Sequence, residues 1–181
     1  MEVNITPFEG LLVLKPRIFS DQRGHFLETW NRSTFRALIG KEIEFVQDNE
    51  SVSQRNVLRG LHLQLEPHAQ GKLIHVVNGS VIDVVVDIRD GSATYGKHFK
   101  ITLDAVKKTM LFIPPGFAHG FVALEDDTIF AYKCTKSYDH GSERTILWND
   151  PDLGIDWGIT DPIISEKDAQ GIPFRGDWRS K

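Results

Sequence analysis

A short segment around one histidine is the first place in this sequence where chemistry is possible. In Val57 to Gln64 (VLRGLHLQ), the two-residue period of a β-strand places Gly60, His62 and Gln64 on one face with Leu58, and Arg59, Leu61 and Leu63 on the other. One face of the strand therefore has a polar lining. Because imidazole titrates near neutral pH, His62 is a candidate proton acceptor, and a hydrogen-bonded structural histidine is the more common alternative.

A second histidine follows a turn in Phe112 to Phe121 (FIPPGFAHGF). Its pattern P-x-G-x-x-H is similar to the second motif of the cupin superfamily, whose first motif has two further histidines and a glutamate near an upstream glycine. His62 takes the first of those ligand positions, but Gln64 stands in place of the second histidine, and no glutamate follows at the right offset. An amide oxygen is a poor ligand for transition metals beside imidazole. We therefore expect no bound metal, and a metal-dependent oxygenase is disfavoured.

A histidine that binds no metal is free to act as a general base. Removing a proton next to a ketone requires a base with a pKa near neutrality, an electrophile for the enolate oxygen and, for inversion, a donor on the opposite face. Lys72 starts the strand after His62, and Tyr132 lies on a late strand. They are candidates for the electrophile and the donor. The alternatives are a solvated lysine at a strand end and a buried tyrosine bonded to a neighbour.

The composition is that of an ordinary globular protein. The chain has 181 residues, of which 40% are hydrophobic and 25% charged, and its formal net charge is −4. There is no basic stripe, so we expect no nucleic-acid partner, although a phosphorylated small molecule remains compatible. The single cysteine, Cys134, cannot form an internal disulfide. With no signal-like N-terminus and no long apolar run, the sequence predicts a cytoplasmic protein without a membrane partner.

Short β-type runs separated by turn residues dominate the chain. Strands are predicted over residues 10–15, 24–30, 45–48, 57–64, 72–77, 80–87, 98–103, 109–113, 120–124 and 128–135. Asn78-Gly79 predicts a hairpin between two of these runs, because both residues tolerate positive φ. One short helix is predicted over residues 33–40, with hydroxyl residues before it and a glycine at its end.

The stretch from Asp150 onward is rich in Asp, Pro, Trp and Gly, which predicts a tail that wraps the domain with short turns. No linker or repeat divides the chain. We therefore predict one domain over residues 1–181, an all-β, cupin-type jelly-roll barrel with a few short helices. A barrel of this size has an interior wide enough for one small ligand.

Several long segments, taken in order, resemble the dTDP-4-dehydrorhamnose 3,5-epimerase family. They are Phe19 to Asn31, Phe45 to Ser51, Val57 to Gln64, Gln70 to Arg89, Phe112 to Phe121, Ala131 to Pro151 and Ile164 to Gly171. Ordered motifs over nearly the whole chain are far more specific than one triplet. The main departure is Leu63, where the family often has tyrosine; by alternation this side chain faces away from His62.

The resemblance implies a role for each matched residue. His62 matches the catalytic base, Asp168 the carboxylate that orients it, Tyr132 the proton donor on the other face of the sugar, and Lys72 the cation that stabilises the enolate oxygen. Positive groups around the sugar nucleotide are implied at Arg23, Arg59, His119 and Lys167. Further binding positions are implied at Phe26 (against the base), Glu28, Gln47, Asp48, Asn49, Tyr138 and Glu143. No cofactor is implied.

The implied reaction inverts C3 and C5 of dTDP-4-dehydro-6-deoxy-D-glucose, giving dTDP-4-dehydro-L-rhamnose for dTDP-L-rhamnose biosynthesis. Both C–H bonds adjoin one carbonyl, so a single base and a single oxyanion site serve both inversions. A mono-epimerase at C3 or C5, a keto-isomerase on a related dTDP-4-keto-6-deoxysugar, and a cupin that only binds a sugar nucleotide remain as alternatives. The family consists of homodimers, and the resemblance implies that residues of the N-terminal strands complete the neighbour's site.

Overall fold

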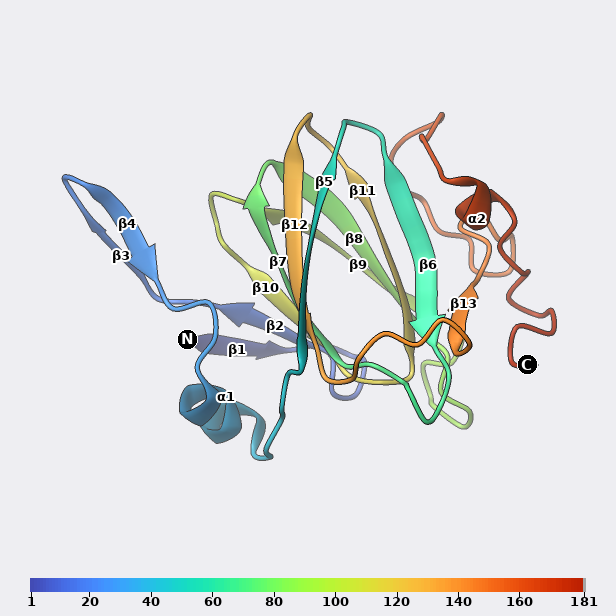
Figure 1. Cartoon of the computed structure of the whole chain (residues 1–181), viewed down its shortest axis with the longest axis horizontal. Helices are drawn as coiled ribbons and strands as arrows, with labels where there is room; N and C mark the ends of the chain where they lie inside the picture. Colours follow the sequence, from blue (N-terminus) through green and yellow to red (C-terminus); the bar gives the residue numbers. More distant parts are fainter. Residues whose placement is uncertain (181) are drawn as a thin grey trace.

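Two antiparallel sheets face each other and form a barrel, as predicted (Figure 1). The computed structural model describes residues 1–180. The six-stranded sheet has the order β1 (Glu2–Ile5), β2 (Leu12–Lys15), β10 (Met110–Ile113), β7 (Lys72–Asn78), β12 (Thr128–Cys134) and β5 (Gln47–Ser53). The five-stranded sheet has the order β13 (Glu143–Thr145), β6 (Leu58–Gln64), β11 (Phe117–Ala123), β8 (Ser80–Asp87) and β9 (His98–Asp104).

A separate hairpin of β3 (Ile18–Asp21) and β4 (Gly24–Leu27) projects from the barrel (Figure 1). The sequence predicted a strand at residues 24–30 but no partner for it. The hairpin is rich in exposed apolar side chains, because Phe19 and Phe26 retain 50% and 69% of their accessible surface. Such surface on a projecting element is typical of a segment that packs against another molecule.

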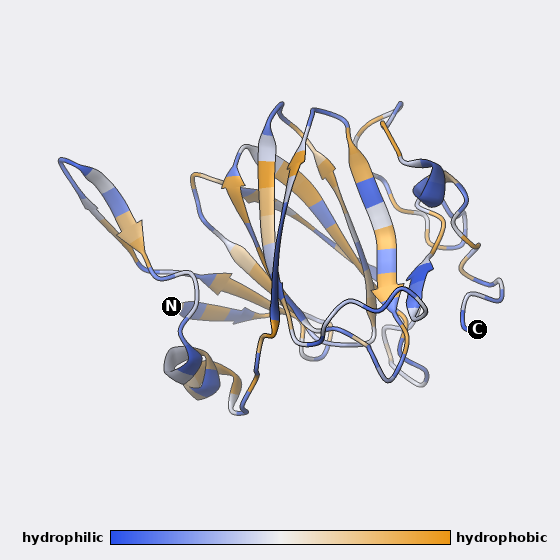
Figure 2. Cartoon of the chain, in the orientation of Figure 1, coloured by the Kyte–Doolittle hydropathy of each residue, from blue (hydrophilic) through white to orange (hydrophobic). Residues whose placement is uncertain are grey.

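Buried apolar residues form three clusters. Hydrophobic residues recur along the strands of both sheets (Figure 2). Inward-facing residues such as Ile74, Val85 and Phe130 fill the barrel interior. A second cluster lies between the outer face of the five-stranded sheet and the C-terminal tail, and a third lies beneath helix α1 (Arg32–Ile39) on the other sheet. The tail and helix α1 therefore each cover part of the outer face of one sheet.

The predicted helix is confirmed to within one residue. Asn31 caps its N-terminus by accepting a hydrogen bond from the Thr34 amide, and Gly40 ends it with a φ of 76° while donating to the Arg36 carbonyl. The capping side chain is thus an asparagine amide rather than one of the hydroxyl residues. Phe35 is the buried anchor of the helix and packs edge-on against Phe112.

The predicted hairpin at Asn78-Gly79 is wrong, because the strands that flank it belong to different sheets. β7 pairs with β10 and β12, whereas β8 pairs with β9 and β11. Gly79 has the expected positive φ of 76°, but Asn78 does not share it, and its side chain donates instead to the Asp127 carbonyl. The dipeptide therefore carries the chain from one sheet to the other. A turn motif fixes local direction, whereas strand partners are decided by packing of the whole barrel.

The predicted alternation along β6 is also wrong at its centre. Arg59 and His62 line the same cavity, whereas Leu58, Leu61 and Leu63 all join the cluster beneath the tail. The ladder between β6 and β11 shifts register, since His119 pairs with His62 but Phe121 pairs with Arg59. Gly60 lies at this irregularity with a φ of 142°, and a Cβ there would come within 2.6 Å of the Gly120 Cα. Only glycine fits this close approach of the two strands.

The C-terminal tail wraps the five-stranded sheet as predicted. Trp157 and Trp178 bury their rings against the sheet, and the Trp178 indole donates to the Phe174 carbonyl at 2.7 Å. The tail also contains helix α2 (Glu166–Ala169), which lies beside β6 and whose N-cap, Ser165, accepts a hydrogen bond from the Asp168 amide. The tail therefore brings Asp168 within hydrogen-bonding distance of His62 on β6. Within residues 1–180, no helix is long and apolar enough to span a membrane.

Candidate active site

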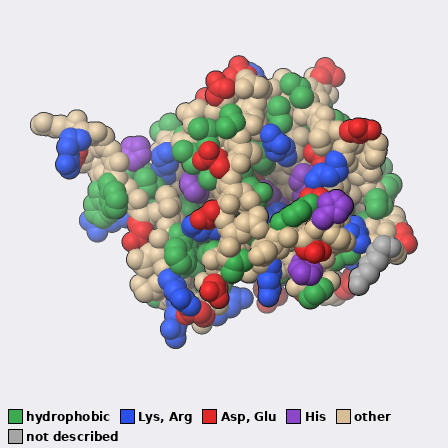
Figure 3. Space-filling model, viewed as in Figure 1, with side chains coloured by type: hydrophobic (Ala, Val, Ile, Leu, Met, Phe, Trp, Pro, Cys, Tyr) green, Lys and Arg blue, Asp and Glu red, His purple; other side chains and the backbone are tan. Residues whose placement is uncertain are grey.

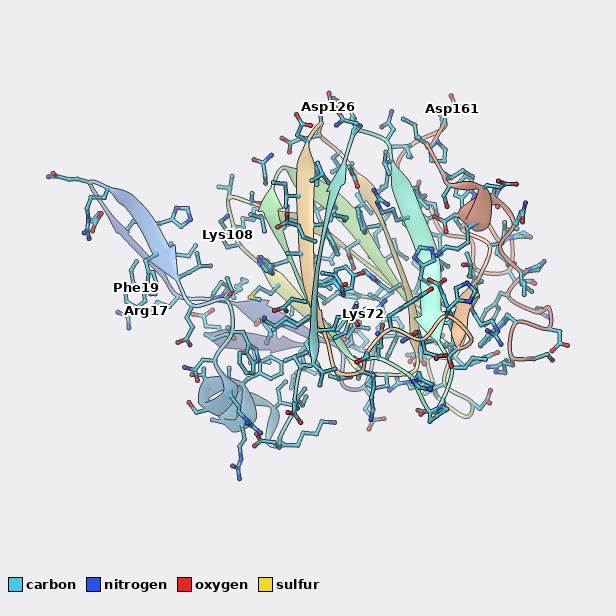
Figure 4. All side chains as sticks on the ribbon, viewed as in Figure 1. Arg17, Phe19, Lys72, Lys108, Asp126 and Asp161 are labelled. Carbon is cyan, nitrogen blue, oxygen red and sulfur yellow. The ribbon has the colours of Figure 1, made fainter. Side chains whose placement is uncertain are left out.

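A cavity of about 440 Å³ opens into the barrel from one face. Ten of the residues singled out in the sequence line it: Gln47, Asn49, Arg59, His62, Lys72, His119, Tyr132, Tyr138, Glu143 and Lys167. Figure 3 shows basic and histidine side chains around a hollow on this face, and Figure 4 shows Lys72 in the middle of the barrel. Residues spread over more than a hundred positions of sequence thus meet in one cavity.

His62 and Asp168 form a hydrogen-bonded pair. The Nε2 atom of His62 lies 2.5 Å from Oδ1 of Asp168, which is buried and also faces the Gly60 amide through Oδ2 at 3.4 Å. Burial raises the pKa of Asp168, but hydrogen bonds from His62, Gly60 and Ser165 outweigh it and hold the pKa below its ordinary value. Asp168 is therefore a carboxylate that orients the ring through Nε2. The other ring nitrogen, Nδ1, is left to act on a ligand.

Lys72 enters the cavity from the facing sheet. Burial is the main influence on this amine and lowers its pKa, while Cys134, Asp83 and Glu143 partly offset the effect. Its Nζ atom lies 5.9 Å from the centre of the Tyr132 ring. The structure therefore answers the question left open by the sequence: Lys72 is a cavity residue and not a solvated lysine at a strand end.

Tyr132 lies across the cavity from His62, because β12 belongs to the six-stranded sheet and β6 to the five-stranded one. Burial is the main cause that raises the pKa of its phenol, so the hydroxyl stays protonated at neutral pH. Among the described residues, no side chain or backbone group forms a hydrogen bond with the Tyr132 hydroxyl, whose pKa is set by burial and nearby charges alone. A ligand held between the two sheets would thus have a base on one side and a proton donor on the other.

Polar residues at the cavity mouth hold one another in place. Glu143 accepts from Lys167 at 2.9 Å and from the Tyr138 hydroxyl at 3.1 Å. The Gln47 side chain accepts from the Tyr138 amide at 2.8 Å and donates to Asn49 at 2.8 Å. Tyr138 is half exposed, so its ring is free to stack on a flat ligand group such as a nucleobase.

Four of the singled-out residues are not brought to the cavity of their own chain. The Asp48 side chain lies on the outer face of β5, where it binds Lys133 at 2.7 Å. Arg23 and Phe26 belong to the projecting hairpin, and Arg23 pairs there with Asp21 at 2.5 Å. Glu28 follows the hairpin and accepts a hydrogen bond from Asn31. The cavity as built from one chain therefore lacks these groups.

Gln64 stands in place of a second metal-binding histidine, and its side-chain amide forms hydrogen bonds with backbone groups. Its oxygen accepts from the Asp139 amide at 2.6 Å, and its nitrogen donates to the His68 carbonyl at 3.1 Å. Gln64 therefore fixes the loop that carries Tyr138. Over residues 1–180, no three His, Cys, Asp or Glu side chains are arranged to hold a metal ion.

Sequence reasoning missed several residues of the cavity and its floor. Phe121 and Phe130 stack with their ring centres 4.2 Å apart and form an apolar wall. Asp83 is fully buried and binds His119 at 2.8 Å. The signal for Asp83 was available in the sequence, since a carboxylate interrupts the apolar run of β8 (SVIDVVVD) at an inward position.

Comparison with known proteins connects this site to one family. The family model described as dTDP-4-dehydrorhamnose 3,5-epimerase matches residues 5–176. The Shigella flexneri protein named dTDP-4-dehydrorhamnose 3,5-epimerase is 47% identical over 174 residues, which cover 96% of each chain.

Two solved structures are similar in sequence and in fold. The Legionella pneumophila dTDP-6-deoxy-D-glucose-3,5-epimerase, in complex with dTDP-4-keto-L-rhamnose, is 42% identical, with a TM-score of 0.92 and coverage of 96% of this chain and 92% of that one. A 3'-monoepimerase from Streptomyces bikiniensis in complex with dTDP-quinovose is 34% identical, with a TM-score of 0.91 and coverage of 96% and 88%. On the family match and these identities, the chain belongs to the dTDP-4-dehydrorhamnose 3,5-epimerase family.

Proposed function

We propose that this protein epimerises C3 and C5 of dTDP-4-dehydro-6-deoxy-D-glucose to give dTDP-4-dehydro-L-rhamnose. One observation carries the proposal: the His62–Asp168 pair and the unpartnered Tyr132 hydroxyl approach the cavity from opposite sheets, with Lys72 beside the tyrosine. A binding protein needs no base and donor on opposite sides of its ligand, so the arrangement favours inversion over binding alone.

Each inversion is a proton removal followed by a proton return. His62 takes the proton from C3 or C5 through Nδ1, and Asp168 stabilises the imidazolium that forms. The electron pair of the broken C–H bond moves to the C4 carbonyl oxygen, where the Lys72 ammonium stabilises the negative charge of the enolate. Tyr132 then donates its hydroxyl proton to the same carbon from the other face. The tyrosinate regains a proton from solvent, and His62 releases its own.

Proton NMR in heavy water with the 4-keto substrate tests this assignment. The wild-type protein should replace the hydrogens at both C3 and C5 with deuterium and invert both centres. His62→Ala should abolish both exchanges, and exchange that survives at either carbon would remove His62 as the base. Tyr132→Phe should retain some exchange while losing inversion, because abstraction and return then occur on the same face. Full inversion of both centres by this variant would contradict the role of Tyr132.

Inversion of a single centre is the second candidate. The similarity to a 3'-monoepimerase shows that the fold also carries a reaction at one carbon. The same NMR experiment separates the two outcomes: deuterium at C3 with an unchanged hydrogen at C5 would establish a mono-epimerase. A product with its carbonyl moved to another carbon would instead establish a keto-isomerase.

The proposed reaction needs no metal, so treatment with EDTA should leave the activity unchanged. Loss of activity in EDTA that iron or zinc restores would overturn that expectation.

We also propose that the hairpin β3–β4 completes the cavity of a second copy in a homodimer. Arg23, Phe26 and Glu28 lie outside the cavity of their own chain, on or beside an element that projects from the barrel (Figure 1). Phe19 and Phe26 expose apolar surface there that a neighbouring chain would cover. Arg59 and Lys167 neutralise only part of the negative charge of a diphosphate, and an arginine from a second chain would add a bidentate partner.

The cytoplasmic location expected from the sequence stays a prediction.

A further inference from the structure

A carboxylate lies in the apolar core of the barrel, below the cavity. Asp83 stands between Val81 and Val85 on β8, and both valines belong to the interior cluster. The two-residue period of the strand therefore turns Asp83 inward as well. The residue is fully buried. Removing a charged group from water is costly unless it is paired, so a purely structural role would be filled better by an apolar residue.

Asp83 is only half satisfied by its surroundings. Its Oδ2 atom lies 2.8 Å from Nε2 of His119, on the neighbouring strand β11. Its Oδ1 atom has no hydrogen-bond partner among the described residues. Among residues 1–180, the hydrogen bond of this carboxylate is therefore to a residue of the cavity wall.

His119 is buried in the cavity wall and stacks against Phe130, with ring centres 6.0 Å apart. Burial is the largest influence on its pKa and, with Lys72 and His62, outweighs Asp83, so the pKa lies below the ordinary value of 6.5. The neutral ring is therefore favoured at neutral pH, in contrast to the cation that the sequence suggested. In a neutral ring that faces a carboxylate through Nε2, the proton lies on Nε2 and the lone pair lies on Nδ1.

We propose that Asp83 is a positioning residue, which fixes the ring and tautomer of His119 so that Nδ1 accepts a hydrogen bond from a hydroxyl of the bound hexose. The inference rests on the proposed function to the extent that the ligand is a dTDP-linked hexose. Asp83 never touches the sugar. It acts through His119, in the way that the aspartate of a hydrolase triad holds the tautomer of its histidine.

The test compares affinities for dTDP-glucose and for dTDP, measured by calorimetry. Asp83→Asn keeps the size of the side chain but offers His119 either an oxygen or an NH₂ group, so the tautomer is no longer fixed. We expect affinity for dTDP-glucose to fall about tenfold, as for the loss of one hydrogen bond to the ligand. Affinity for dTDP, which lacks the hexose, should stay within about twofold. Equal losses for the two ligands would show a general distortion and overturn the proposal, as would an unchanged affinity for dTDP-glucose.

A double-mutant cycle shows whether Asp83 acts through His119. His119→Ala should weaken dTDP-glucose binding to a similar extent, and Asp83→Asn should add nothing in the His119→Ala background. Additive losses would show that Asp83 acts by another route. Asp87→Asn is the matched control, since Asp87 is also fully buried on β8, two positions beyond Val85, but is bound by Arg89, Ser92 and Thr94 instead of a cavity residue. That variant should lose stability without changing the ratio of the two affinities.

Nitrogen-15 NMR of the free protein reads the tautomer directly and needs no substrate. The wild-type spectrum should show His119 with a protonated Nε2 and a bare Nδ1. Asp83→Asn, or Asp83→Leu if the asparagine oxygen still accepts, should show a mixture or the reverse tautomer. An unchanged spectrum in both variants would overturn the proposal. Wild-type protein that bound neither dTDP nor dTDP-glucose would count against the proposed function, and the spectrum would then decide the positioning role by itself.

Discussion

At the scale of single residues, burial acts in opposite directions on the two groups that face His62. It lowers the pKa of Lys72 and raises that of Tyr132, because in both cases it disfavours the charged form. The lysine is thus ready to lose its proton at a lower pH than an exposed lysine would, whereas the phenol keeps its proton. Both shifts favour loss of the Lys72 charge before loss of the Tyr132 proton as the pH rises.

The alkaline limb of the pH profile should therefore report Lys72. We expect kcat/KM to fall with rising pH, with an apparent pKa below the ordinary lysine value of 10.5. Lys72→Arg should lower kcat/KM at pH 8 by about tenfold or more, because a planar guanidinium does not replace a compact ammonium, yet its alkaline limb should move to higher pH. Lys133→Arg, on the outer face of the sheet, is the control and should leave the limb unchanged. A limb that stays in place in Lys72→Arg would assign it to another group.

At the scale of elements, the C-terminal tail contributes to the candidate active site, because it carries Asp168, the hydrogen-bond partner of His62. The tail is held by rings in the cluster that also contains Leu58, Leu61 and Leu63 of β6. One face of β6 thus carries His62 toward the cavity, and the other face packs against the tail that carries Asp168. The His62–Asp168 contact therefore depends on the packing of the tail against β6.

Trp178→Ala should test this coupling. The ring is 1% exposed, so its removal should cost about 3–5 kcal/mol in the free energy of unfolding, measured by urea denaturation. Arg175→Ala, whose side chain is 79% exposed, should change it by less than about 0.5 kcal/mol. At a temperature where Trp178→Ala remains folded, its kcat/KM should fall because Asp168 is held less firmly. Full activity in this variant would show that α2 stays in place without the ring.

The loop after β8 should make the protein sensitive to acid. Asp87 is fully buried and accepts hydrogen bonds from Arg89, Ser92 and Thr94. Burial raises the pKa of its carboxyl, but these bonds outweigh it and place the pKa far below the ordinary 3.8. A depressed pKa gives stability that is present above the unfolded value and is lost as the pH falls toward the folded one. Asp87→Asn should thus be less stable than wild type by about 3 kcal/mol at pH 7, with the difference shrinking below about pH 4. A difference that is constant with pH would show that the charge does not matter.

At the scale of the whole molecule, the cavity of a single chain contains His62, the proposed base, but lacks Arg23, one of the cations proposed to bind the substrate. Arg23 and Glu28 lie with the hairpin on one side, and the cavity lies in the barrel. If the hairpin serves a second copy, each active site takes its base from one chain and its arginine from the other. Two differently damaged chains can then restore one site between them.

Mixing His62→Ala with Arg23→Ala protein tests this exchange. Each variant alone should be inactive or nearly so. After joint unfolding and refolding, half of the dimers are mixed, and each mixed dimer has one intact site, so roughly a quarter of the wild-type activity should return. If Arg23 serves its own chain, no mixed dimer gains a complete site and activity should not return. Sedimentation should confirm in parallel that both variants still form dimers.

The sequence by itself determined the class of the fold and named the groups that we propose take part in the reaction. Periodic apolar residues report burial, so most strands, the helix at Phe35 and the tail were predictable. Ordered motifs identified His62, Lys72, Tyr132 and Asp168 by resemblance. Gln64 showed that the usual metal ligands were incomplete before any contact was known.

Only the tertiary structure decided which groups meet. His62 and Asp168 are separated by 106 positions, and no local pattern places them 2.5 Å apart. Alternation put Arg59 on the wrong face because the register shift beside Gly120 depends on a second strand. Asn78-Gly79 connects two sheets rather than two paired strands, because the partners of β7 and β8 lie elsewhere in the chain. Local pattern records how buried each residue is, whereas partners, register and the tautomer of His119 depend on packing between strands far apart in the chain.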